Sequence, residues 1–112
     1  MTAIEISQGE RAGWQRRAVG ELGRILAAHP DLPCISWTVG QAGSVIVGQV
    51  SGPAAAGQVR QIFDAWRLAL ELGEFGDHQM SSGAAWLHAT ARRHEVRVRL
   101  TATVFPDDDK ER

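Results

Sequence analysis

The sequence contains a single cysteine, Cys34, among its 112 residues. One thiol excludes a disulfide within the chain and a metal site built from four thiolates of one chain. Uninterrupted apolar runs are only a few residues long, whereas a transmembrane helix needs about 20 apolar residues. The N-terminus carries Glu5 and Glu10, where a secretory signal has a basic segment and an apolar core. We therefore expect a cytoplasmic protein with no membrane partner.

Catalytic signatures are missing as well. The chain has no Gly-x-Ser-x-Gly sequence, phosphate-binding loop, Gly-x-Gly-x-x-Gly sequence or paired-carboxylate arrangement. Cys34 follows Pro33 at the entrance of an expected strand. A reactive thiolate needs a base or a helix N-terminus beside it, so this position favours a small packed residue over a nucleophile. The sequence thus predicts a protein that is not an enzyme and uses no cofactor.

The histidines form no recognisable metal pattern. His78, His88 and His94 lie near Asp77 in the chain, but their spacing matches no zinc motif. We also expect His88 to face Arg97, whose charge would repel a cation. The prediction is therefore that the protein has no metal site.

Composition and length are those of one ordinary globular domain. Hydrophobic residues make up 44% of the chain and charged residues 22%. We predict a single α+β domain at 1–105 and an acidic, solvated tail at 106–112. The formal net charge is −1, yet ten arginines face seven acidic residues between positions 11 and 105. The body of the protein is therefore modestly basic.

The clearest pattern is a β-hairpin over 83–105, where two runs of period-two alternation meet at a charged tip. A tip of two or four residues keeps the apolar residues of both runs on one face. Arginine is unfavourable at the positive φ angles of a two-residue type I′ turn, and a two-residue tip here would place Arg92 and Arg93 at those positions. We therefore predict a four-residue tip from Ala91 to His94. This register sets Trp86 opposite Arg99 and His88 opposite Arg97.

Two helices and a second hairpin precede it. Ser7 and Glu10 have the spacing of a capping box, and Pro30 should end the helix that follows. Strands are expected at 34–39 and 44–50 around a Gly40–Gly43 turn, with Trp37 opposite Ile46. A second helix should begin at 51–53 and end near Gly73. The pattern of residues 74–82 predicts a polar loop or the frayed first part of the third strand.

This order, αββαββ, predicts a two-layer sandwich. Two helices should pack on one face of a four-stranded, mainly antiparallel sheet, which leaves the other face open. The open face should combine apolar, hydroxyl and basic side chains. Its members are Cys34, Ser36, Thr38, Val45, Val47, Trp86, His88, Arg97, Arg99, Thr101 and Thr103.

The open face supports two hypotheses about function. The first is a homodimer or a complex with a protein partner, because an apolar centre with a polar rim and the residues Trp and Arg are typical of interfaces. Its candidate interface is Ser36, Thr38, Val45, Val47, Trp86 and Arg99. The alternative is a nucleic-acid-binding regulator that uses the basic hairpin 86–99. Its candidate residues are Arg92, Arg93, Arg97, Arg99 and Trp86.

Three short segments resemble small uncharacterised proteins of actinobacteria. They are Trp37-Thr-Val-Gly40, Phe63-Asp-Ala-Trp66 and Leu100-Thr-Ala-Thr-Val-Phe105. The resemblance covers most of the chain, from about the first helix to Phe105. It implies a compact bacterial cytoplasmic protein, and it carries over no catalytic or binding residue.

Overall fold

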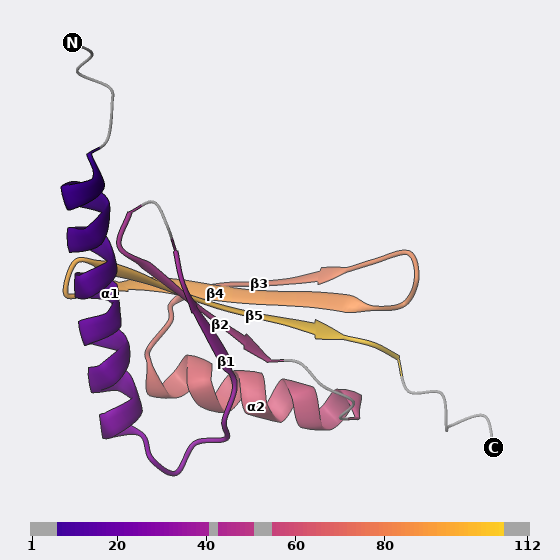
Figure 1. The fold of residues 1–112 in the computed structure, drawn as a ribbon. Helices are drawn as coiled ribbons and strands as arrows, with labels where there is room; N and C mark the ends of the chain where they lie inside the picture. Colours follow the sequence, from indigo (N-terminus) through magenta and orange to yellow (C-terminus); the bar gives the residue numbers. More distant parts are fainter. Residues whose placement is uncertain (1–6, 41–42, 51–54, 107–112) are drawn as a thin grey trace.

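The structure is a computed structural model that describes residues 7–40, 43–50 and 55–106. Its elements follow the order αββαβββ (Figure 1). They are α1 (Gln8–Ala28), β1 (Ser36–Val39), β2 (Val45–Val50), α2 (Ala56–Ala69), β3 (Glu74–Gln79), β4 (Ala85–Arg93) and β5 (Val96–Val104). Apart from Pro106, the predicted acidic tail lies outside the described residues.

The sheet is mixed and has five strands. The prediction of a four-stranded sheet was therefore wrong in the number of strands. The strand order is β1-β2-β5-β4-β3, with β2 and β5 parallel and the other neighbours antiparallel. The additional strand is β3, in the segment predicted as a polar loop or a frayed strand. Phe75 is its only large apolar side chain, so no period-two apolar pattern marks it. Backbone pairing with β4 holds it in the sheet.

Helix α1 begins as predicted. The Ser7 hydroxyl accepts a hydrogen bond from the backbone N–H of Glu10 at 3.0 Å, and the Glu10 carboxylate accepts one from the Ser7 backbone N–H at 3.1 Å. This capping box satisfies backbone donors that a helix N-terminus leaves free. Ala18 and Ile25 enter the core. Glu21 is buried with them, only 1% exposed.

Helix α2 buries Val59, Phe63 and Trp66, which recur at helical spacing along one face. The start predicted at 51–53 falls largely outside the described residues, and the described helix begins at Ala56. Its end differs from the prediction. Glu71, rather than Gly73, adopts the left-handed conformation, with φ 55°. The Leu72 and Glu71 N–H groups donate to the carbonyls of Arg67 and Leu68, which is the Schellman pattern of a helix C-terminus.

Trp37 lies opposite Gly48 in the β1–β2 hairpin, two residues from the predicted partner Ile46. A Cβ atom at Gly48 would lie 2.8 Å from the Trp37 ring, so only glycine leaves room for the indole there. The ring in turn packs edge-on against Trp66, with centroids 5.4 Å apart. Aromatic packing therefore sets this register, which turn length alone mispredicts.

Both helices share one core with one face of the sheet. Helix α1 crosses the end of the sheet where β4 turns into β5, and α2 runs beneath the strands (Figure 1). The buried side chains of the sheet are Ile46, Val50, Ala85, Leu87, Ala89, Val96, Val98, Leu100, Ala102 and Val104. The alternate residues form the other face, so the predicted alternation of the 83–105 hairpin is confirmed. No helix within the described ranges is long and apolar enough to cross a membrane.

The β4–β5 turn has two residues rather than the predicted four. Arg93 pairs with Val96, and His94 and Glu95 form the turn with φ angles of 51° and 66°. Both angles are those of a type I′ turn. This left-handed conformation raises the free energy of a non-glycine residue by about 1–2 kcal/mol at each position. The tip is centred two residues later in the sequence than predicted, so each β4 residue lies opposite a β5 residue four positions further along the chain. Trp86 lies opposite Thr103, and His88 lies opposite Thr101.

Gly48→Ala should lower the free energy of unfolding by about 1–3 kcal/mol, because the new methyl group overlaps the packed Trp37 ring. Gly20→Ala is the matched control. Gly20 is exposed in α1 with open space at its Cβ position, so alanine there should stabilise the helix by about 0.5–1 kcal/mol. Urea denaturation measures both effects. Equal effects of one sign would contradict the packing explanation.

Candidate functional site

The uncovered face of the sheet, which we call the open face, is organised in four rows of residues that run across the strands. Strand pairing places the members of each row side by side. From the β4–β5 turn outwards the rows are Val45–Arg97–Arg92, Thr38–Val47–Arg99–Thr90–Glu74, Ser36–Gln49–Thr101–His88–Gly76 and Thr103–Trp86–His78.

The residues of the predicted protein interface do not form one patch. Ser36, Thr38, Val45, Val47 and Arg99 occupy neighbouring positions on β1, β2 and β5. Trp86 lies in the last row, separated from the valines by the row that contains Gln49 and Thr101. Within this set, the apolar centre is therefore limited to the two valines. Both are half-buried.

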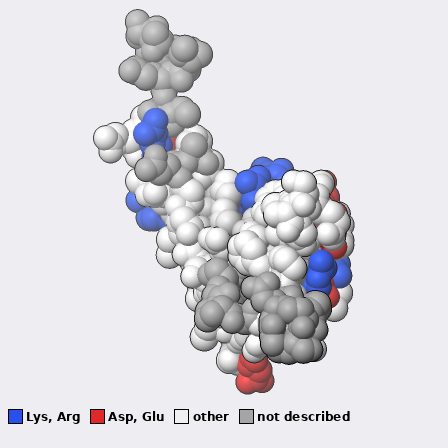
Figure 2. All heavy atoms as spheres, turned by 90° about the vertical axis from the view of Figure 1, so that its right-hand side faces the viewer, with Lys and Arg blue, Asp and Glu red and all other residues white. Residues whose placement is uncertain are grey.

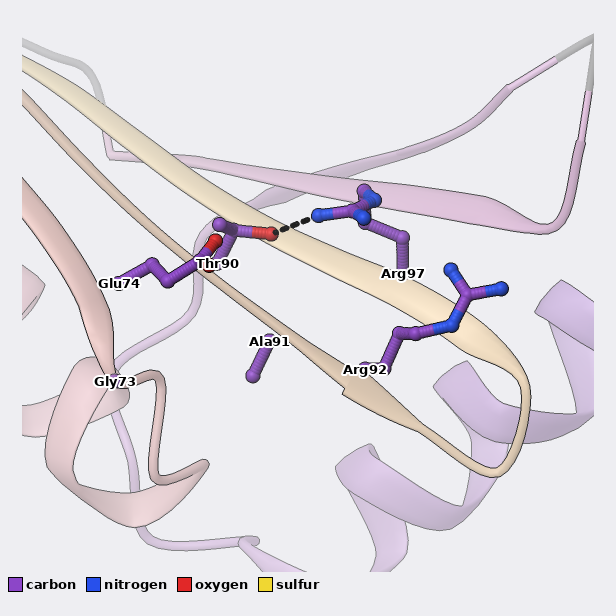
Figure 3. Close-up of a pocket in the computed structure, with 6 residues that line it drawn as sticks. All are labelled: Gly73, Glu74, Thr90, Ala91, Arg92 and Arg97. Carbon is purple, nitrogen blue, oxygen red and sulfur yellow. Dashed lines mark hydrogen bonds between the residues drawn. The ribbon is translucent and has the colours of Figure 1, made fainter.

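Three arginines form the densest charge on the open face. Arg92 and Arg97 lie directly opposite each other on β4 and β5, and Arg99 follows on β5 beside Thr90. Like charges in opposite positions destabilise a sheet. Figure 3 shows Arg92 and Arg97 on these neighbouring strands, with Arg97 donating to the Thr90 hydroxyl at 3.4 Å. Among the described residues, no ion pair joins any of the three arginines to a carboxylate.

Two open hollows meet at this arginine cluster. One, of about 320 Å³, is lined by Glu74, Thr90 and both Arg92 and Arg97. The second, of about 460 Å³, includes the same two arginines together with Trp14, Arg17, Ser44, Val45 and Glu95. Figure 2 views the molecule from the other end of the sheet, where charged atoms form small separate groups.

Arg93, the remaining predicted nucleic-acid residue, points to the helix side of the sheet. Its Nε donates to Glu21 Oε2 at 3.3 Å, and its Nη1 donates to the Leu70 carbonyl at 3.2 Å. His94 Nδ1 and Arg24 Nη2 each donate to Glu21 Oε1 at 2.8 Å. The buried carboxylate therefore joins α1 to the β4–β5 turn. This role of Arg93 and His94 was not apparent from the sequence.

The surroundings of Glu21 set its charge. Burial raises the pKa of this carboxyl group, whereas hydrogen bonds from Arg24, His94 and Arg93 lower it, helped by the charge of His94. The pKa of Glu21 is on balance lowered from its ordinary value of 4.5. Glu21 is therefore an anion at neutral pH, and hydrogen bonds from two guanidinium groups and one imidazole compensate its burial.

Trp86 does not pair with Arg99 as predicted. It stacks on His88, with centroids 4.6 Å apart, and on His78 of β3. The sequence could not place His78 in this cluster, because β3 was not recognised as a separate strand. Cys34, expected to be packed, is exposed.

Comparison of the chain with protein-family models and with curated proteins finds no match. Family and function therefore rest on the residues themselves, and the resemblance to small actinobacterial proteins stays a prediction.

Glu21→Gln should lower the free energy of unfolding by about 2 kcal/mol at pH 7, because charge-assisted hydrogen bonds become neutral ones. The pKa of Glu21 is lower in the folded than in the unfolded state. The stabilisation is therefore complete above the unfolded value and is lost as the pH falls through the folded value. Urea denaturation of both proteins between pH 7 and pH 3 should show their difference shrinking below about pH 4.5. A difference that stays constant would contradict this role.

Proposed function

We propose that this protein is a non-enzymatic module whose open face binds single-stranded nucleic acid. The observation that carries the proposal is the cluster of Arg92, Arg97 and Arg99, which lacks a carboxylate partner within the described residues. The positions that pair Arg92 with Arg97 cost stability in the isolated protein. A bound phosphate would offset the repulsion between the two arginines, because guanidinium groups bind phosphate through paired hydrogen bonds.

The shape and the chemistry of the surface favour a single strand. Arg97 and Arg99 are two positions apart on β5, so their side chains leave the same face about 7 Å apart. Threonine hydroxyls at 90, 101 and 103 share this face and can donate to phosphate or sugar oxygens. Trp86, 37% exposed, offers a ring edge or face for a base at the far end of the same strands. An open sheet face with these groups fits an extended strand.

Replacing Arg92, Arg97 and Arg99 together with glutamine should weaken binding of a mixed-sequence single-stranded oligonucleotide at least tenfold in low salt. Each phosphate contact contributes about 0.7 to the slope of log K against log salt for single strands. Because three contacts are removed, the slope of log K against log salt should be smaller in magnitude by about two for the variant. Fluorescence anisotropy over a salt series measures affinity and slope together.

The matched control removes the same charge from the helices, as Arg11→Gln, Arg16→Gln and Arg60→Gln. Arg11 and Arg16 lie on α1, and Arg60 on α2 pairs with Asp77 at 3.2 Å. This control should bind with nearly wild-type affinity and slope. If both triple variants lose affinity equally, binding follows net charge, and the open face is not the site.

A second candidate function, self-association, is favoured by a different observation. Val45 and Val47 are neighbouring, half-buried apolar residues on the open face. Val47 lies opposite Thr38 of the short edge strand β1, and Ser36 lies opposite Gln49 in the next row. Two copies packed through this side would bury the valines while leaving Trp86 outside the contact. In this arrangement Arg97 and Arg99 form the rim.

Val45→Thr with Val47→Thr tests this second candidate without adding charge beside the arginines. In a twofold dimer the change occurs at four positions, each costing about 1 kcal/mol for a hydroxyl buried without a partner. The dimer should then dissociate roughly a thousandfold more readily. Sedimentation velocity measures the change, with Gln49→Glu on the same strand as the control. A wild-type protein that is monomeric at all concentrations removes this candidate.

A further inference from the structure

His78 and His88 bring two imidazole nitrogens together on the open face. Their Nε2 atoms are 3.0 Å apart, while the ring centroids are 5.0 Å apart and the ring planes differ by 7°. Because the nitrogens are much closer than the ring centres, the rings meet edge to edge rather than face to face. One Nε2 donates its proton to the lone pair of the other.

The fold builds this pair from three features of β3 and β4. His78 lies opposite Trp86, and Gly76 lies opposite His88. A Cβ atom at Gly76 would lie 2.3 Å from His88 Nε2, so glycine lets the His88 ring lean across β3 towards His78. The Trp86 indole stacks against both rings, with centroids 4.6 Å from His88 and 5.7 Å from His78. Together these contacts restrict both imidazoles.

The spacing of the nitrogens matches that of two ligands on one metal ion. Nitrogens bound at about 2.0 Å and at a right angle to each other lie about 2.8 Å apart, and tetrahedral ligands about 3.3 Å apart. The observed 3.0 Å falls between these values. A neutral imidazole can carry its proton on Nδ1, which frees both Nε2 lone pairs. His78 is exposed and His88 is half-buried, so small ring rotations can direct both lone pairs to one point.

The charges around the pair differ from those expected from the sequence. His88 lies opposite Thr101, while Arg97 lies opposite Arg92, near the turn. Arg99 and Glu74 both lie in the row between His88 and the row of Arg92 and Arg97. Their opposite charges offset each other's effect on a cation bound at the histidines. Asp77 points to the helix side, where Arg60 binds it at 3.2 Å. In the described part of the chain no third histidine, cysteine or carboxylate completes a cluster. Two protein ligands leave the other coordination positions to water or to a bound molecule.

We propose that His78 and His88 form an accessible two-imidazole site for a divalent transition metal ion, with Cu²⁺ bound most tightly. Paired imidazoles suit Cu²⁺, Ni²⁺ and Zn²⁺, and Cu²⁺ leads the usual order of affinity for nitrogen ligands. The site requires none of the arginines near the turn, and it shares Trp86 with the proposed nucleic-acid surface.

Isothermal titration with CuCl₂ in a non-coordinating buffer tests the site. Wild-type protein should bind one Cu²⁺ at this site, and His78→Ala and His88→Ala should each weaken that binding at least tenfold. His29→Asn is the matched control, because it removes one imidazole at the end of α1, where His29 lies outside the pair and contacts Trp66. Its Cu²⁺ affinity should equal that of the wild type.

Trp86 provides a second readout. Bound Cu²⁺ quenches a nearby indole, so the fluorescence of wild-type protein should fall as the site fills. Trp86→Phe should lose most of that quenching and keep the calorimetric stoichiometry. The proposal is overturned if both alanine variants fold, as judged by circular dichroism, and bind Cu²⁺ as tightly as the wild type. It is equally overturned if the wild type shows no Cu²⁺ binding that depends on either histidine.

Discussion

The buried carboxylate of Glu21 is the contact on which the arrangement of the open face depends. It accepts hydrogen bonds from Arg93 and His94 at the β4–β5 turn and so ties that turn to α1. The turn residues adopt positive φ angles that their own side chains disfavour. Contacts with Glu21 offset that cost, together with the weak ion pair of Arg17 and Glu95 at 3.9 Å. A two-residue turn then fixes the pairing along both long strands.

That pairing decides which groups meet on the open face. With the turn at His94 and Glu95, Arg92 lies opposite Arg97, whereas the predicted tip at 91–94 would have placed His88 there. The same register separates Trp86 from Arg99 and brings Trp86 into contact with His78 and His88. The face therefore has a basic end near the turn and an aromatic end far from it. The proposed nucleic-acid surface and the proposed metal site follow from this division.

Alternation, capping and helical periodicity predicted the α+β class and the face of the sheet on which each residue of β4 and β5 lies. These signals are local, and the structure uses them, as at Ser7 and along Val96–Val104. Registers were mispredicted where a distant contact decides them. Trp37 needs the space above Gly48, and His94 needs Glu21 from a helix far away in the sequence. Strand β3 was missed because Phe75, against Phe63 and under the Arg67 guanidinium, is its only large apolar anchor.

The most direct test of the open face as the binding surface is NMR mapping of backbone and side-chain shifts during titration with a single-stranded oligonucleotide. The account predicts that the largest shifts fall on the arginine side chains at 92, 97 and 99 and on the strand segments around them. The Glu21 contacts and the outer surface of α2 should shift little. Shifts concentrated on the helices, with the three arginines unaffected, would contradict the account.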